Sequence, residues 1–239
     1  MTTFVRVGQA STSAVSNTQR KEVVVEAYVD AKGYVQNAGF VHQPIMALEK
    51  GAITGPKAIV LHRTDSTTAT GSIQAFQSGV GTHFIVDKDG AVTQTASLLK
   101  QTAHVGKIKS KCYESGTCTA DETKKIKGWG FAPSKVYDHE KVKDYPARYP
   151  MNKDSIGIET VAKYTEATKT TAAAWEAPTI EQSTSISRIV GILKKNYGIS
   201  GKDIYEHDKI SYKTPGEGAG LYGGDDESVG PSIVPPRSP

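Results

Sequence analysis

Four polar residues, widely separated in the chain, have the types that hydrolytic chemistry needs. His62 closes the apolar run 57–61. Glu159 lies in a later run of the same kind, and His207 is followed by Lys213. Imidazoles can bind a metal ion, a carboxylate can move protons, and an ammonium group can stabilise an oxyanion. Each residue alone could also have a purely structural role, such as a buried structural histidine or a solvated carboxylate. The hypothesis of a hydrolytic site therefore depends on their combination.

Two apolar runs are predicted to form buried strands that carry these side chains. Residues 57–61 end at His62, and residues 155–161 alternate so that Ile156 and Ile158 share one face while Glu159 lies on the other. Side chains at the ends of strands are held by a rigid scaffold and can be aimed into a cleft.

The stretches between and around these runs predict a hairpin and helices. Residues 82–86 and 91–94 are strand-like and are separated by an Asp-Gly turn, which is a strong hairpin signal. Residues 70–78 have a weak helical pattern, and residues 22–29 alternate like a strand.

The clearest helix is predicted to begin after Thr179. Gln182 lies three residues later, which is the pattern of a capping box, and apolar residues then recur at helical spacing. Gly198 is a suitable stop for this helix. Its apolar face predicts a core element rather than a functional one.

Taken in chain order, these residues resemble the zinc amidases of the type-2 amidase and peptidoglycan-recognition superfamily. The resemblance extends from about Lys57 to Gly218 and is interrupted by one basic segment. The matching segments are residues 62–64, 82–90, 102–106 and 156–159, and His207 with Lys213 and Thr214. The order and the spacing of the five matches together carry the resemblance.

The resemblance implies an α/β fold with a mixed central β-sheet, flanking helices and a zinc site at one end of the sheet. It implies that His62 and His207 bind Zn²⁺, which lowers the pKa of a bound water to about 7. Glu159 matches the catalytic acidic position of the family and would take a proton from this water and pass it to the leaving amine. Lys213 matches the conserved lysine, which would stabilise charge on the scissile carbonyl oxygen.

The chain departs from the family pattern at the third metal ligand. The family has Asp or Cys two positions after the lysine, where this chain has Pro215, which cannot bind a metal. We expect Glu217, in a glycine-flanked turn, to take this role, although it could instead only hold the loop in place. The remaining candidates are Asp208, Asp225 and Asp226.

Four further histidines are weaker candidates for function. His83 and His104 match family histidines beside the cleft; we expect His83 to be structural, whereas His104 could touch the substrate. His42 and His139 have no supporting context and are expected to be surface or packing residues.

Composition and charge limit the classes of function. The net charge of +4 and the pI near 8.8 are too weak to indicate nucleic-acid binding. They are compatible with an anionic polymer such as a cell wall, or with solubility alone. The N-terminal residues lack the pattern of a secretory signal, and no apolar run of about 18 residues predicts a membrane span. An enzyme that cuts the wall would then need a dedicated secretion system, phage-type lysis, or a leader segment that this sequence does not include.

The domain organisation expected is one amidase domain with additions. Residues 1–52 form an N-terminal decoration, residues 53–222 the amidase domain, and residues 223–239 a flexible tail. The insert 107–153 holds eleven Lys or Arg against six Asp or Glu, together with several aromatic residues. We expect little regular structure there, in either a solvated loop or a wall of the substrate cleft. Its two cysteines could form a local disulfide or remain free thiols.

The resemblance implies a peptidoglycan hydrolase that cleaves the amide between N-acetylmuramic acid and L-alanine. The alternative is a non-catalytic module of the same fold that binds peptidoglycan or muropeptide, since such relatives typically lack a metal ligand. The expected site of action is the cell wall, in the periplasm or outside the cell. An immunity protein would be a further partner only if the protein is a toxin delivered into competitors.

Overall fold

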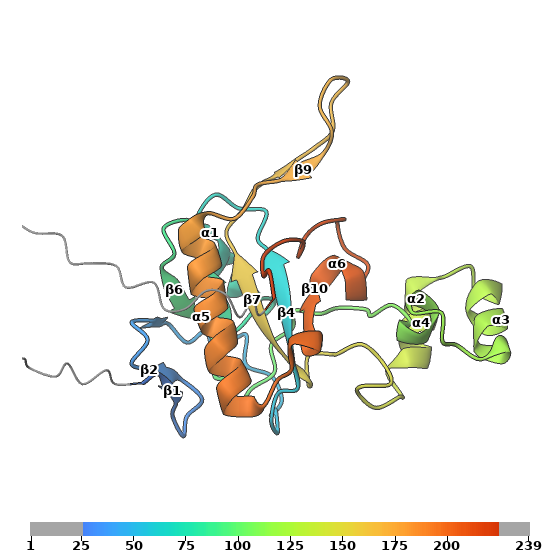
Figure 1. The fold of residues 1–239 in the computed structure, drawn as a ribbon, viewed down its shortest axis with the longest axis horizontal. Coiled ribbons are helices and arrows are strands. Elements are labelled where there is room, and N and C mark those ends of the chain that lie inside the picture. The colour runs from blue at the N-terminus through green and yellow to red at the C-terminus, as the bar shows by residue number, and fades with distance from the viewer. Residues whose placement is uncertain (1–25, 225–239) are drawn as a thin grey trace, which may run out of the picture.

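A six-stranded mixed β-sheet forms the centre of the protein in the computed structural model, which describes residues 26–224 (Figure 1). The strand order is β10-β4-β7-β5-β6-β3. The strands are β3 (Val41–His42), β4 (Ala58–Arg63), β5 (Phe84–Val86), β6 (Val92–Gln94), β7 (Ser155–Thr160) and β10 (Ile204–Glu206). Every pairing is parallel except that of β5 with β6. The predicted mixed sheet with flanking helices is confirmed.

Two small antiparallel sheets lie outside the central one. In the first, β1 (Tyr28–Val29) pairs with β2 (Val35–Gln36). In the second, β8 (Tyr164–Thr165) pairs with β9 (Ala174–Trp175), and this hairpin projects beyond the end of the central sheet (Figure 1). The predicted strand 22–29 is only partly covered, because residues 22–25 lie outside the described part of the chain.

Helix α5 (Ile180–Tyr197) packs one apolar face on the central sheet. Its buried residues join those of β4, β5 and β7 in the largest apolar cluster of the protein. The predicted capping box is present, because Thr179 Oγ1 accepts from the Gln182 N–H and the Gln182 side chain accepts from the Thr179 N–H. Gly198 ends the helix in the left-handed conformation, as predicted.

The remaining helices are short. The weak helical pattern near residue 70 corresponds to α1 (Ala69–Phe76). The 3₁₀ turn η1 (Gly201–Asp203) precedes β10, and α6 (His207–Ile210) follows β10 directly. The hairpin of β5 and β6 forms where the Asp-Gly turn predicted it. No helix among residues 26–224 is both long and apolar enough to cross a membrane.

The insert 107–153 has more regular structure than expected. It contains α2 (Lys111–Glu114), α3 (Ala120–Gly128) and α4 (Pro133–Glu140), and Cys112 forms a disulfide with Cys118. Helix α3 begins with a capping box at Thr119 and Glu122. Apolar periodicity does not predict these highly charged helices, because α2 buries no side chain, α3 buries one and α4 buries two.

We predict that Thr179→Ala lowers the free energy of unfolding by about 1 to 2 kcal/mol. The substitution removes the acceptor for the Gln182 N–H and also the hydrogen bond from Thr179 Oγ1 to the Lys88 carbonyl. Urea unfolding measures the change. Thr184→Ala, at an exposed position one turn into the same helix, is the control. An equal loss there would show that the cap has no special role.

Candidate active site

Strand register brings the predicted residues to one edge of the sheet. In the parallel pairing of β4 with β7, His62 lies directly opposite Glu159, so the two side chains are neighbours on one face. On the other side of β4, Glu206 lies opposite Leu61, and His207 follows as the first residue of α6. The carboxyl ends of adjacent parallel strands are a common place for a ligand site.

Three side chains converge at this edge as a group that could hold a metal ion. One ligand atom from each of His62, His207 and Glu217 lies within 4.8 Å of the others. Glu217 Oε1 is 2.7 Å from His207 Nδ1 and 3.6 Å from His62 Nδ1. Both imidazoles are buried, and their centroids are 4.1 Å apart.

The hydrogen bonds of His207 leave its Nδ1 directed at the centre of the group. Its Nε2 lies 2.8 Å from the Val105 carbonyl, which can only accept, so Nε2 carries the proton. Nδ1 and Glu217 Oε1 are both acceptors in a neutral imidazole and an ionised carboxylate, so a proton or a cation must lie between them. This chemistry suits a metal ion.

His62 is oriented in the same way by a second histidine. His104 Nε2 lies 3.3 Å from Ser155 Oγ, whose own proton is donated to the Met151 carbonyl. His104 Nε2 is therefore the donor, and His104 Nδ1 accepts from His62 Nε2 at 3.1 Å. The Nδ1 lone pair of His62 is then free for a ligand. Such bonds behind a metal ligand fix its tautomer and its ring orientation.

His83 and Gly157 complete the layer behind these rings. His83 Nδ1 accepts from the Gly157 N–H and its Nε2 donates to the Lys100 carbonyl, so His83 is structural in this geometry. A Cβ on Gly157 would lie 2.7 Å from His104 Nδ1. Only glycine at this position of β7 therefore lets the His104 ring approach His62.

Burial keeps these histidines uncharged. It lowers the pKa of His62 to about 3, with a further contribution from the charge of His207, and it lowers the pKa of His83 to about 4. Burial also lowers the pKa of His104, to which the neighbouring histidines add. Neutral imidazole is the form that binds a metal.

Glu159 and Lys213 line the same cleft, which has a volume of about 250 Å³. Burial raises the pKa of Glu159 to about 8, the charge of Glu217 raises it further, and Lys213 opposes the shift. Burial also opposes the ionisation of Glu217, but hydrogen bonds to His207 and His62 outweigh it and lower the pKa of Glu217 to about 2. The two carboxyl groups are thus suited to different roles.

The loop that carries Glu217 is held through its backbone by two buried charged residues. Arg63 Nη1 donates to the carbonyls of Gly216 and Glu217, at 2.8 and 3.1 Å. The Asp208 carboxylate accepts from the N–H groups of Gly216 and Gly218, at 2.8 and 3.2 Å. Asp208, a candidate third ligand from the sequence, is instead committed to this loop.

Gly218 lets the same loop lie close against β10, and the β8–β9 hairpin contacts this loop through Trp175. A Cβ on Gly218 would lie 2.6 Å from Glu206 Cα, so no larger residue could follow Glu217 at this distance. Trp175 Nε1 donates to the Pro215 carbonyl at 3.2 Å.

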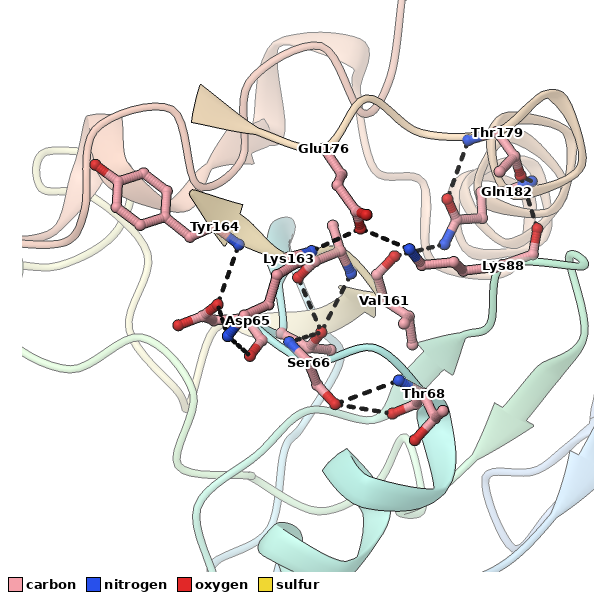
Figure 2. A network of polar contacts seen from close by, with 12 residues as sticks. Asp65, Ser66, Thr68, Lys88, Val161, Lys163, Tyr164, Glu176, Thr179 and Gln182 are labelled. Carbon is pink, nitrogen blue, oxygen red and sulfur yellow. Dashed lines mark hydrogen bonds and ion pairs between the residues drawn. The ribbon is translucent and has the colours of Figure 1, made fainter. Parts of the chain in front are cut away.

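The base of the hairpin is fixed by a polar network (Figure 2). The Glu176 carboxylate bonds both Lys88 Nζ and the Lys163 N–H, and the Tyr164 N–H donates to Asp65. The hairpin therefore supports the loop that carries Glu217 from a rigid base.

The other sequence candidates lie away from this cleft or outside the described residues. His42 bonds the Val35 carbonyl, and His139 packs on Trp129 in the insert, in keeping with packing roles. Asp225 and Asp226 lie outside the described part of the chain. Sequence reasoning missed the roles of Arg63 and Gly157, although Arg63 directly follows a predicted ligand.

A comparison with protein families identifies the chain's relatives. The family model described as N-acetylmuramoyl-L-alanine amidase matches residues 53–217, which is more than half of the chain. The chain belongs to this family. Membership supports a peptidoglycan amidase activity. A search of curated proteins gave no match.

Solved structures of several amidases are similar to this chain at low identity. A selenomethionine AmpD derivative is 17% identical over 75% of this chain and 86% of its own, with a TM-score of 0.47. The endolysin LysCS from Clostridium intestinale URNW is 16% identical over 76% and 89%, with a TM-score of 0.44. PlyL is 15% identical over 73% and 84%, also with a TM-score of 0.44.

We predict that the metal-free protein loses stability as the pH falls from about 6.5 towards 4. The unfolded chain binds protons at its histidines in this range, whereas His83, with a folded pKa of about 4, does not. Between pH 7.5 and pH 5, His83 alone should account for about 2 kcal/mol. Urea unfolding in the presence of a chelator measures the slope.

His83→Gln should flatten this slope, whereas His42→Gln in the exposed strand β3 should leave it unchanged. Glu159→Gln should steepen it. Because the folded pKa of Glu159 is raised to about 8, this group makes the protein less stable as the pH rises from about 4.5 to 8, which opposes the effect of the histidines. Its removal leaves the histidine effect unopposed. Equal slopes in all variants would contradict the burial of neutral His83.

Proposed function

We propose that this protein is a zinc-dependent N-acetylmuramoyl-L-alanine amidase, which hydrolyses the amide between N-acetylmuramic acid and L-alanine in peptidoglycan. The observation that carries the proposal is the convergence of His62, His207 and Glu217 at the edge of the sheet, beside Glu159 and Lys213. Family membership supplies the class of substrate.

The donor set fits zinc. Two imidazole nitrogens and one carboxylate oxygen are a common ligand set of catalytic zinc sites, and three protein ligands leave one coordination position open. His62, His207 and Glu217 would hold the ion. When bound, zinc would supply Lewis acidity and lower the pKa of water at that position to about 7.

Glu159 is proposed to move the proton during hydrolysis. Its carboxyl group faces the cleft from the strand position beside His62, and its raised pKa lies near neutrality. A group with such a pKa can accept a proton from the attacking water and return it to the leaving amine. The alanine nitrogen leaves as a neutral amine only if it receives this proton.

Lys213 is proposed to stabilise the carbonyl oxygen of the scissile amide. This oxygen gains negative charge when water attacks, and an ammonium group positioned beforehand lowers the barrier. Lys213 lines the cleft together with both histidine ligands.

The cell wall is the proposed place of action, in the periplasm or outside the cell. The disulfide between Cys112 and Cys118 supports this, because disulfides form and persist in oxidising compartments. Export by a dedicated secretion system and release by phage-type lysis are both compatible with it.

Glu159→Gln should lower turnover of purified sacculi by about 10²- to 10⁴-fold while one zinc ion per chain remains bound. The amide keeps the shape of the side chain but cannot accept the proton. Turnover is measured as release of stem peptides with a free N-terminal alanine, and zinc by elemental analysis. Activity close to that of the wild type would refute the role of Glu159.

His62→Ala should lose both the metal and the activity, because the ligand atom itself is removed. A wild-type protein that binds zinc and sacculi but releases no peptide would instead be the non-catalytic binding module.

Asp208→Ala should weaken zinc binding by about 10- to 100-fold, because Glu217 loses the contacts that hold its loop. Asp208→Asn keeps one acceptor oxygen and should lose less. Affinity is measured by competition with a chromogenic chelator. Asp138→Ala in the insert is the matched control, and equal affinities in all four proteins would refute the role of Asp208.

A further inference from the structure

The insert 107–153, here called the basic lobe, accounts for the entire net positive charge of the chain. The chain has 29 Lys and Arg against 25 Asp and Glu, and the lobe alone has eleven against six. The remaining residues therefore have 18 against 19 and are close to neutral. Such a separation of charge indicates a local function rather than general solubility.

The basic lobe has a fixed shape. The disulfide of Cys112 and Cys118 joins α2 to the start of α3. The buried Glu140 accepts from Ser110 Oγ and from Lys143 Nζ, both at 2.8 Å, and Lys143 also bonds Glu122 on α3. These contacts fix the three helices relative to one another, so the groups on the lobe surface are presented in a constant arrangement.

Three lysines of α3 face solvent on this rigid lobe. Lys124, Lys125 and Lys127 are exposed, and none has a polar side-chain partner among residues 26–224. Lys107, Lys109, Lys111, Lys141 and Lys143 of the same lobe, in contrast, all bond other groups of the protein. Like charges this close on one helix repel each other, and an anionic ligand would relieve the repulsion.

A hollow beside these lysines adds an apolar surface. It has a volume of about 300 Å³ and is lined by Tyr113, Thr123, Lys127 and the disulfide. The Phe131 ring packs edge-on against Tyr113, with centroids 5.0 Å apart, and remains 43% exposed. Aromatic rings beside ammonium groups suit a ligand that offers both apolar and anionic groups.

The base of the basic lobe is attached to the candidate active site. Ile108 forms a β-bridge with Ser211, and Lys109 Nζ donates to the Asp208 carbonyl at 2.7 Å. Both contacts are with the segment that begins at His207. In Figure 1 the lobe helices extend outward past α6, so a polymer held in the cleft could continue along the lobe.

We propose that the basic lobe is a second binding surface for the anionic cell-wall polymer. Lys124, Lys125 and Lys127 pair with its carboxylate or phosphate groups, and Tyr113 and Phe131 contact its apolar faces. The inference rests on the proposed function for the identity of the polymer. Exposed ion pairs are screened by salt, so the lobe's contribution falls as the ionic strength rises.

Co-sedimentation of the full chain with purified sacculi tests the proposal. The triple variant K124E/K125E/K127E should bind at least about tenfold more weakly than the wild type at low salt, and its binding should depend less on salt. The triple variant K32E/K100E/K202E is the matched control, because these lysines are also exposed and also lack side-chain partners among the described residues. It has the same charge change outside the lobe and should bind within about twofold of the wild type.

Equal weakening in both triple variants, or none in either, would overturn the proposal. Phe131→Asn should also weaken binding, because Asn tolerates the left-handed backbone at this position (φ 57°) but removes the ring. Thermal unfolding of each variant shows that it is folded.

Further arms identify the anion and separate the two proposals. Sacculi stripped of phosphate polymers with hydrofluoric acid distinguish the two anions. If the lobe-dependent binding is retained on stripped sacculi, the lysines pair with stem-peptide carboxylates. If it is lost, they pair with phosphates. Turnover of soluble muropeptides should be unchanged in K124E/K125E/K127E, so loss of wall binding alone implicates the lobe. Wild-type protein without amidase activity would refute the proposed function and leave the binding result intact. Tighter lobe-dependent binding to DNA than to sacculi would overturn the proposal.

Discussion

The parallel pairing of β4 with β7 on one side and β10 on the other is the constraint on which the site depends. It places His62 beside Glu159 and ends β10 one residue before His207. Residues about 100 and 145 positions from His62 thereby reach the same sheet edge. A shift of register by one residue would turn His62 or Glu159 to the opposite face of the sheet.

Behind this edge, the site depends on correctly oriented imidazoles, and burial lowers the pKa of His62 and of His104 so that both stay neutral. Val105 fixes His207, and the chain of bonds from Ser155 through His104 fixes His62. Burial is costly for a charged imidazole but favours the neutral form that a metal needs. The same layer explains why β7 has glycine at position 157, where any side chain would displace His104.

The loop that carries Glu217 is held so that this carboxylate lies beside the two histidines. Pro215 cannot bind a metal, and Glu217 reaches the histidines only because its loop is held from two directions. Arg63 and Asp208 bond its backbone, and Gly218 allows it to lie directly on β10. Under the proposed function, Glu217 would take the role of metal ligand that Pro215 cannot take.

The sequence by itself determined the strands that end at His62 and Glu159, the β5–β6 hairpin and helix α5, because apolar periodicity, the Asp-Gly turn and the capping box are local signals. The family resemblance gave the candidate residues in order. Only the tertiary structure decided that Glu217, rather than Asp208, faces the two histidines, since their positions depend on contacts with Arg63 and the backbone of distant segments. The helices of the insert also depended on it, because a disulfide and the partly buried ion pairs of Lys143 hold them together, and neither has a periodic pattern in the sequence.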